Sequence, residues 1–340
     1  MGLSQGTFRG RRSGFGTCRE RAFPPGRPVA DRGLDSELEG ATMAEVKLSR
    51  VSRFVRSYCV TDGRKFRLKE WDPGDTGGLK EDKKKAKELL ATGVKQLADL
   101  QDKLFAQDRW GVLLIVQAMD AAGKDGTIKH VMSGVNPQGC QVYSFKSPSA
   151  EELNHDFLWR TSKCLPEQGR IGIFNRSYYE EVLAVRVHPE FLAKQHLPPK
   201  LVTKEIWRER FESIVDLEKH LARNGMVILK FFLNVSRKEQ KKRFLERLEL
   251  PHKNWKFSEA DARERGFWKD YMLAYEDAIR VTAKPWAPWY VVPADNKWFT
   301  RLIVAGAVID AMAKLDLHYP EVDAEKKKEL SKARALLESE

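Results

Sequence analysis

The sequence predicts an α/β protein built around a doubly wound parallel sheet. Short apolar runs, rich in β-branched residues and too short for helices, alternate with longer segments of helical periodicity. These runs lie at residues 112–116, 171–174, 226–233 and 289–293, and a further short strand is predicted at 140–145. Strands that are buried on both faces and separated by helices are typical of a parallel sheet covered by helices on each side.

The first apolar run leads into a turn that suits phosphate binding. The segment Gly123-Lys124-Asp125-Gly126-Thr127 follows it, and a helix is expected to start near Ile128. Backbone N–H groups and the positive end of the helix dipole attract an anion there, and the lysine adds a mobile charge. The strict pattern G-x-x-x-x-G-K-S/T is not met, because Ala118 replaces the first glycine and Asp125 replaces the hydroxyl residue. The alternative is an ordinary turn that needs Gly123 only for its backbone angles.

The charge balance predicts an anionic partner. The 340 residues carry a formal net charge of +12, and the pI is about 9.4. Nucleic acid, a membrane surface and a polyanionic small substrate would all fit this charge. No apolar run approaches the ~20 residues needed to span a bilayer, so no membrane partner is expected. Four cysteines lie far apart without metal-site spacing, which predicts reduced thiols in a cytoplasmic protein; they are Cys18, Cys59, Cys140 and Cys164.

The chain divides into three regions. Residues 1–42 carry seven arginines, no lysine and eight glycines, so we expect a disordered extension there. Residues 43–320 form the predicted working domain, which starts with an extended arm at 45–78. An amphipathic helix is predicted at 79–105, and its lysine run at 83–85 is expected to face solvent. Residues 321–340 form a charged tail, predicted to be a solvated helix.

Further helices are expected between the strands. One is predicted to carry Leu153, Phe157, Leu158 and Trp159 on a single face, and others are predicted at 201–224 and 302–315. The span 236–275 lies between two strands and is rich in Lys, Arg and Trp. This composition predicts a mobile lid over the phosphate-binding turn.

Three separated motifs resemble those of the polyphosphate kinase 2 family. They are VQAMDAAGKDGTIKHVMSGVNPQG, IFNRSYYEEVLAVRVHP and the later WKFS–D–ER–W–Y–A–APWYVVPAD series. The resemblance covers roughly residues 45–316 and implies a three-layer P-loop kinase-like fold with a helical lid. It also implies phosphoryl transfer between inorganic polyphosphate and a nucleotide with Mg²⁺, and a homodimer or homotetramer. The second motif looks most like the subgroup that phosphorylates both AMP and ADP, and subgroups that prefer one of them compete.

Four residues are expected to carry the chemistry. Lys124 would hold a phosphate, since the helix dipole disfavours a cation there without an anion nearby. Asp120 is expected to bind Mg²⁺, and polarising the attacking phosphate or capping the helix are alternatives. Arg176 can grip a phosphate with its planar fork. Asn175 lacks the charge of the Asp that many P-loop enzymes carry at this strand end, so it would orient metal-bound water or the acceptor.

Other residues are assigned to the phosphates and the nucleotide. The phosphate-binding set is Gly123, Asp125, Gly126, Thr127, Lys129 and Arg160. The nucleotide and lid set is Glu180, Arg208, Arg243, Arg247, Lys253 and Lys256. Asp125 is expected either to share the metal or to cap the helix, and Glu180 either to contact the acceptor or to lie at a solvated helix start. Closure of the lid would exclude water, so that the phosphate passes to the nucleotide.

Two other functions fit part of the sequence, and a phosphohistidine intermediate is an alternative to direct transfer. An ATP-dependent P-loop nucleotide kinase would normally carry a hydroxyl residue where Asp125 stands. A nucleic-acid-binding protein suits the charge, but no signature of such a domain is present in the sequence. The seven histidines pair with no nucleophile, so direct in-line transfer without a phosphohistidine is predicted. The expected substrates are inorganic polyphosphate and adenine nucleotides, with guanine nucleotides left open.

Overall fold

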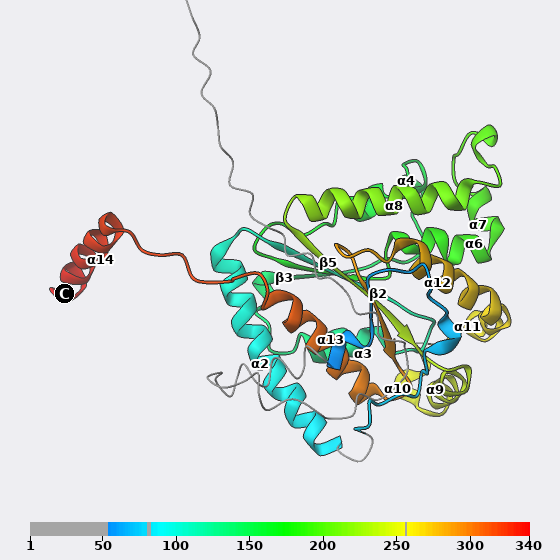
Figure 1. Cartoon of the computed structure of the whole chain (residues 1–340), viewed down its shortest axis with the longest axis horizontal. Helices are drawn as coiled ribbons and strands as arrows, with labels where there is room; N and C mark the ends of the chain where they lie inside the picture. The colour runs from blue at the N-terminus through cyan, green and yellow to red at the C-terminus, as the bar shows by residue number, and fades with distance from the viewer. Residues whose placement is uncertain (1–53, 80–82, 256) are drawn as a thin grey trace, which may run out of the picture.

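Six strands form one sheet in the order β1-β6-β5-β2-β4-β3 (Figure 1). The computed structural model describes residues 54–79, 83–255 and 257–340. Its strands are β1 (Cys59–Val60), β2 (Gly111–Gln117), β3 (Cys140–Ser144), β4 (Ile171–Asn175), β5 (Met226–Asn234) and β6 (Trp289–Pro293). Strands β2 to β6 are all parallel to one another, and β1 pairs antiparallel with β6 at the edge of the sheet. The predicted extension at 1–42, the start of the arm and Lys256 lie outside the described residues.

Helices cover both faces of the sheet, so the doubly wound three-layer prediction is confirmed. One face carries α2 (Lys83–Gln107), α3 (Lys124–Val131) and α13 (Lys297–Met312), and α13 packs against both of the others (Figure 1). The opposite face carries α8 (Ile206–Arg223) and α12 (Trp268–Thr282). Shorter connecting elements are η1 (Leu68–Glu70), η2 (Pro137–Gly139), α4 (Ala150–Leu153), α5 (Trp159–Ser162), η3 (Tyr178–Val182), α6 (Ala184–Val187), α7 (Pro189–Ala193) and η4 (Pro199–Leu201).

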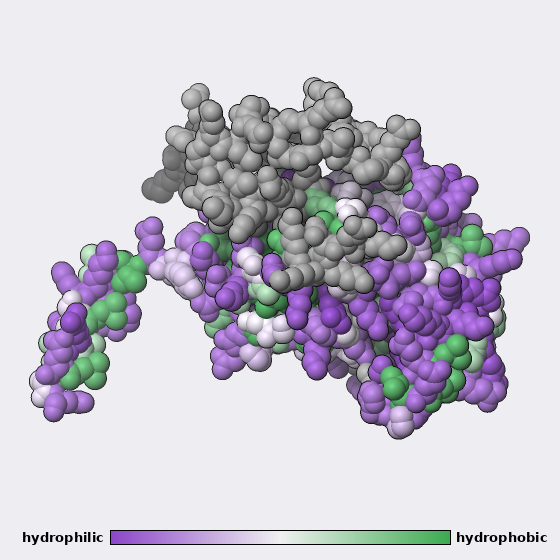
Figure 2. All heavy atoms as spheres, turned by 90° about the horizontal axis from the view of Figure 1, so that it is seen from below, coloured by the Kyte–Doolittle hydropathy of each residue, from purple (hydrophilic) through white to green (hydrophobic). Residues whose placement is uncertain are grey.

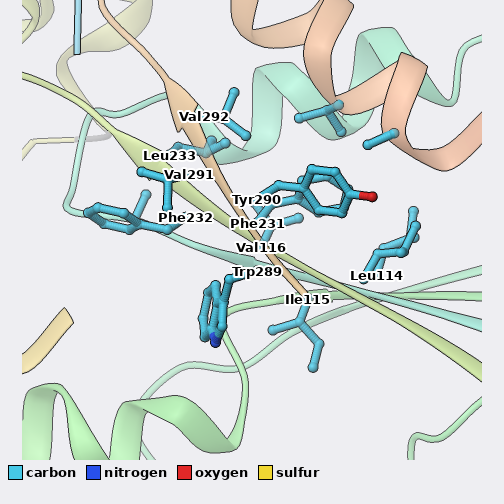
Figure 3. Packing of buried hydrophobic residues seen from close by; sticks show 14 of the residues in the cluster. Leu114, Ile115, Val116, Phe231, Phe232, Leu233, Trp289, Tyr290, Val291 and Val292 are labelled. Carbon is cyan, nitrogen blue, oxygen red and sulfur yellow. The ribbon is translucent and has the colours of Figure 1, made fainter. Parts of the chain in front are cut away.

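The centre of the sheet is closed to solvent. Every residue of β2 and β6 is buried, and so are eight of the nine residues of β5. Figure 3 shows how apolar side chains from these three strands pack together, among them Ile115, Phe232 and Trp289. Because the strands are buried on both faces, they appear in the sequence as continuous apolar runs. Their rigid packing fixes the positions of the loops at their carboxyl ends.

One local prediction was wrong, and one strand was missed. The single helix expected around Leu153–Trp159 is interrupted, because Asn154 ends α4 and Asp156 then folds into a turn in which its Oδ1 accepts a hydrogen bond from the Leu158 N–H (2.9 Å). The predicted arm contains β1, whose two residues complete the sheet beside β6. A two-residue strand leaves no periodicity that a sequence pattern could reveal.

The predicted lid consists of several helices whose two ends pack on the body. It contains α9 (Arg237–Glu249), α10 (Pro251–Asn254), α11 (Glu259–Glu264), η5 (Arg265–Phe267) and the first half of α12. Gln240 and Phe244 of α9 are buried, as are Tyr271 and Tyr275 of α12. In contrast, α10 and α11 bury no residue. A lid that moves would therefore bend between α9 and α12, and its motion stays a prediction.

The tail forms α14 (Ala324–Leu337), which is exposed along its whole length and stands away from the body (Figure 1). Among the described helices, none is both long and apolar enough to cross a membrane.

Candidate functional site

A cavity of about 980 Å³ opens at the carboxyl ends of β2, β3 and β4. This edge is where ligands bind in parallel α/β sheets. The walls come from the turn after β2, the residues that follow β3 and β4, the lid helices and the first turns of α13. The lining residues include the catalytic residues predicted from the sequence, Asp120, Lys124, Asn175 and Arg176.

The turn between β2 and α3 has a backbone that few side chains tolerate. Gly123 has φ 109°, which favours glycine strongly, and Ala121 is also left-handed with φ 61°. The Gly123 carbonyl accepts the Thr127 N–H (2.9 Å), which starts the hydrogen bonding of α3. Gly123, Asp125, Gly126 and Thr127 all line the cavity, so the predicted phosphate-binding segment faces it as a unit.

Three charged groups meet beside this turn. Arg176 Nη2 donates to Asp120 Oδ1 (2.8 Å), and Lys124 Nζ lies 4.0 Å from the same oxygen. Lys124 Nζ also donates to the Ala118 carbonyl (2.8 Å). Burial opposes the charge of Asp120, but the nearby Lys124 and Arg176 outweigh it and hold the pKa of the Asp120 carboxyl below its usual value. Burial lowers the pKa of Lys124, which Asp120 partly offsets.

The end of β4 supplies two more predicted residues. The side-chain Nδ2 of Asn175 donates to Asp125 Oδ1 (2.9 Å), so the amide orients a carboxylate on the facing turn. Arg176 follows with φ 64°, and its N–H donates to the Val116 carbonyl at the end of β2 (3.0 Å). The neighbouring strand therefore holds Arg176 in a left-handed backbone conformation that aims its side chain at Asp120.

Glu180 lies behind Arg176 on η3. In the orientation of the Gln117 amide that satisfies both its oxygen and its nitrogen, the oxygen accepts a hydrogen bond from Ser177 and the nitrogen donates to Glu180 Oε1 (2.9 Å). Burial raises the pKa of the Glu180 carboxyl, against the opposing effects of Arg176 and Lys124. Glu180 is thus part of the charged cluster, although it is not among the residues that line the cavity.

Cationic side chains from distant segments surround the cavity. The predicted Arg247 and Lys253 line it from the lid, together with Trp255. The sequence reasoning missed three lining cations, namely Lys146, Lys297 and Arg301. Burial lowers the pKa of both Lys297 and Arg301. A Cβ on Gly126 would lie 4.0 Å from Arg301 Nη2, so the start of α13 reaches the first turn of α3.

Besides Glu180, the structure keeps three predicted residues away from this cavity. Lys129 is exposed on α3, and Arg208 is exposed on α8, where it pairs with Glu205 and Glu212. Arg160 is buried and donates to the Lys146 carbonyl (2.8 Å), so it supports the cavity wall from outside. Contacts of Lys129, Arg160 and Arg208 with the substrate stay predictions, and the positions of these residues outside the cavity do not support them. Arg243 lines the cavity but is fully bonded to the protein, as described below.

The site can accommodate a divalent cation that takes most of its ligands from substrate and water. Among the described residues there is no cluster of three or more His, Cys, Asp or Glu side chains suited to a metal. Asp120 uses Oδ1 for Arg176 and is about one-third exposed. One or two carboxylates plus phosphate oxygens are what Mg²⁺ prefers when it binds together with a phosphorylated substrate. Asp120 and Asp125 therefore fit such an ion.

A glycine-rich turn between a buried parallel strand and a helix, facing a cation-lined cavity, defines a P-loop-type phosphate-binding protein. The chain belongs to the polyphosphate kinase 2 family, because the model of that family, "Polyphosphate kinase 2 (PPK2)", matches residues 80–320. The resemblance stated from the motifs is thereby confirmed.

Relatives with this fold are similar over nearly their whole lengths. An ADP-polyphosphate phosphotransferase of Rhodopseudomonas palustris is 53% identical over 83% of this chain and 98% of its own length. An AMP/ADP-polyphosphate phosphotransferase of Meiothermus ruber is 41% identical over 81% of this chain and 98% of its own. The crystal structure of polyphosphate kinase 2 from Arthrobacter aurescens TC1 matches with a TM-score of 0.75 at 41% identity, covering 83% of this chain and 95% of that one.

Proposed function

We propose that the protein transfers a phosphoryl group from inorganic polyphosphate to AMP or ADP. The observation that carries this proposal is the cavity at the strand ends, where the glycine-rich turn, Lys124 and Arg176 face additional cations from α13 and the lid. A chain of linked phosphates needs several positive contacts, which the Lys and Arg side chains lining this cavity supply. The two relatives named for polyphosphate and adenine nucleotides support the same substrates.

Positioning and charge stabilisation account for most of such a reaction. In-line transfer requires the donor, the acceptor and the moving phosphoryl group to be held in a row, with positive charge over its equatorial oxygens. Lys124 would hold the phosphates at the turn, and the planar Arg176 guanidinium would stabilise the charge that develops. Mg²⁺, held by Asp120 with Asp125 beside it, would neutralise phosphate oxygens.

We further propose that transfer is direct. Among the described residues that line the cavity there is no histidine, so the walls offer no imidazole nucleophile. The acceptor phosphate of the nucleotide would attack the terminal phosphorus of the polyphosphate, and the shortened polyphosphate would leave. Rapid-quench experiments with ³²P-polyphosphate should detect no acid-labile phosphoprotein, and its appearance at the rate of turnover would contradict direct transfer.

The central experiment supplies polyphosphate as the sole phosphoryl donor. Purified protein is incubated with AMP, ADP, GMP or GDP, each with and without Mg²⁺, and the products are separated by ion-exchange chromatography. We expect ADP and ATP to form only when the metal is present. Absence of product with polyphosphate but product with ATP as donor would favour the rival ATP-dependent nucleotide kinase.

The family resemblance also supports a homodimeric or homotetrameric assembly. The widely spaced cysteines support a cytoplasmic location. Guanine nucleotides stay an open alternative to adenine nucleotides, which the assay of GMP and GDP beside AMP and ADP decides. Nucleic acid is not proposed as a partner, because the cations converge on a cavity at the strand ends. Salt-sensitive binding to duplex DNA without any transferase activity would count against this view.

A further inference from the structure

Three consecutive carbonyl groups of the phosphate-binding turn are held by side chains of α9. Gln240 Nε2 donates to the Asp120 carbonyl at 2.9 Å. Arg243 Nη1 donates to the Ala121 and Ala122 carbonyls at 3.1 and 2.7 Å. Because these carbonyls point toward α9, the orientation of each peptide plane in the turn is fixed by the lid helix.

Arg243 has no donor left for a substrate. Its Nε donates to Glu239 (2.9 Å), and its Nη2 donates to the carbonyls of Ala294 and Asp295 at 2.7 and 3.1 Å. Together with the two bonds from Nη1, these contacts engage every nitrogen of a guanidinium that is only 4% exposed. Arg243 therefore joins the turn after β2 to the loop after β6.

Gln240 connects the same turn to the far side of the lid. It is 1% exposed and is not among the residues that line the cavity. Its Oε1 accepts a hydrogen bond from Arg265 Nη1 (2.6 Å), which also donates to the Arg237 carbonyl (3.2 Å). A continuous path of hydrogen bonds thus runs from η5 through Gln240 to Asp120.

The fixed carbonyls determine where the N–H groups of the turn point. In a planar trans peptide the C=O and the following N–H point in opposite directions. With the Asp120 and Ala122 carbonyls directed toward α9, the N–H groups of Ala121 and Gly123 are directed away from it. Among the described residues neither N–H has a hydrogen-bond partner, and both residues line the cavity. Neighbouring backbone N–H groups without protein partners in a turn of this kind bind anions.

We propose that Gln240 and Arg243 are positioning residues that shape the anion-binding turn, and that neither contacts the substrate. This replaces the expectation that Arg243 clamps a phosphate. Their loss would let the peptide planes of residues 120–123 rotate and would disperse the N–H groups. The kinetic part of the test rests on the proposed function, whereas the binding part does not.

The first test replaces Gln240 by methionine, which has a similar volume but forms no strong hydrogen bonds. Because Gln240 does not line the cavity, any effect on phosphate must pass through the groups that it bonds, which are the turn and Arg265. For Gln240→Met we expect about a 10-fold loss of kcat and about 10-fold weaker binding of inorganic tripolyphosphate, measured by isothermal titration calorimetry. The matched control is Lys241→Met, an exposed neighbour on the same helix, for which both values should equal those of the wild type.

A second variant covers the case in which Gln240→Met does not fold. Arg243→Lys keeps the positive charge but cannot reproduce the forked bonds to four carbonyls. Because all of its donors already bind protein groups, Arg243 as a positioning residue should lose about 10-fold in both kcat and tripolyphosphate affinity on this exchange. A purely structural role would lower the thermal midpoint and leave both values of the folded protein unchanged.

The outcomes separate this inference from the proposed function. Wild-type kcat and tripolyphosphate affinity in whichever of the two variants folds would overturn the inference. If the wild-type protein binds tripolyphosphate but phosphorylates no nucleotide, the proposed function fails, and the affinities of the variants still decide whether α9 shapes the turn.

Discussion

Arg176 has an unfavourable left-handed backbone conformation, and its side chain forms an ion pair with Asp120. A left-handed φ of 64° in a non-glycine residue costs on the order of 1–3 kcal/mol. The hydrogen bond from its N–H to Val116 and its ion pair with Asp120 maintain this conformation. Such strain is typical of functional sites, where the surrounding structure forces a side chain into a position that the backbone alone would not choose.

The geometry at Arg176 predicts that lysine cannot replace it. A lysine ammonium is a point charge without the planar fork that can bind Asp120 and a phosphate together. We expect Arg176→Lys to lower kcat about 10²-fold, and Lys124→Ala to lower it by a similar or larger factor. Steady-state assays with polyphosphate and AMP measure the effect, and circular dichroism checks the fold. Near-wild-type kcat in a folded variant of either residue would show that the site is misplaced.

The raised pKa of Glu180 predicts a shift in the pH profile. Because burial raises this pKa, Glu180 takes up a proton at a pH above the ordinary value of about 4.3, and Arg176 then loses a neighbouring negative charge. The acid limb of kcat against pH should therefore lie above pH 4.3 in the wild type. In Glu180→Gln, whose side chain does not titrate, this limb should move to lower pH. Superimposable profiles for the two proteins would exclude Glu180 as its origin.

The residues that could be predicted are those next to recognisable strand ends. Asp120, Lys124 and Arg176 follow buried apolar runs directly, so residue type and position together suggested their roles. Lys297 and Arg301 could not be found this way, because they start a mostly apolar helix far along the chain and reach the cavity only after folding.

A buried ion pair joins three elements beneath the sheet. Lys230 of β5 donates to Glu218 of α8 (2.6 Å), and both side chains have no exposed surface. Glu218 Oε1 also accepts hydrogen bonds from Tyr178 (3.1 Å) and Tyr179 (2.8 Å) of η3. Burial lowers the pKa of Lys230 to about 8, against the attraction of Glu218. The pair therefore fixes the segment that follows Arg176, at a considerable cost in desolvation.

Removing one partner of the Lys230–Glu218 pair should lower the free energy of unfolding by more than the pair as a whole contributes to it. Lys230→Met leaves a carboxylate buried without its cation and should cost about 3–5 kcal/mol of unfolding free energy. Glu218→Leu should have a comparable effect. The double variant should cost about 1–3 kcal/mol less than the sum of the two. Urea unfolding of all four proteins measures this coupling, and strictly additive losses would show that the two charges do not interact.

Helices and strands could be predicted from the sequence where their burial requires apolar residues in a run or at helical spacing. Strands β2, β4 and β6 are buried along nearly their whole length and give short apolar runs, and α2 presents Leu97 and Leu104 to the core at helical spacing. The break between α4 and α5 depends on the local bond from Asp156, which competes with helical hydrogen bonding and leaves the apolar spacing unchanged. A prediction based on the spacing of apolar residues alone therefore gave one helix where the structure has α4 and α5.

At the scale of the whole molecule, cationic side chains from segments far apart in the sequence meet at one cavity. Most of the described surface seen in Figure 2 is hydrophilic, with hydrophobic residues scattered over it. Along the cavity, however, cations outnumber carboxylates, because the turn, the lid and α13 all contribute Lys or Arg. The excess of +12 in the sequence indicated an anionic partner, and only the fold shows that these charges converge.

The last prediction concerns the C-terminal tail. Every residue of α14 is exposed, including Leu330 and Leu336, and the helix stands apart from the body in Figure 1. A helix that buries no apolar surface contributes little to folding stability. Deletion of residues 321–340 should therefore leave the thermal midpoint within about 1 °C of the wild-type value, which corresponds to about 0.5 kcal/mol for a chain of this length. Differential scanning calorimetry measures this midpoint.

A longer deletion provides the control for this prediction. Tyr319 donates a hydrogen bond to Asp102 on α2 (2.6 Å), and Leu317 packs against the core. Removing residues 317–340 takes away both contacts and should lower the midpoint by about 2–4 °C, because the half-buried Leu317 contributes part of the about 1.5–3 kcal/mol that complete burial of a leucine side chain supplies. If the shorter deletion destabilises the protein as much as the longer one, α14 must contact another surface in solution. A second copy of the chain would then be the first partner to test, by comparing the sedimentation of the full-length and shortened proteins.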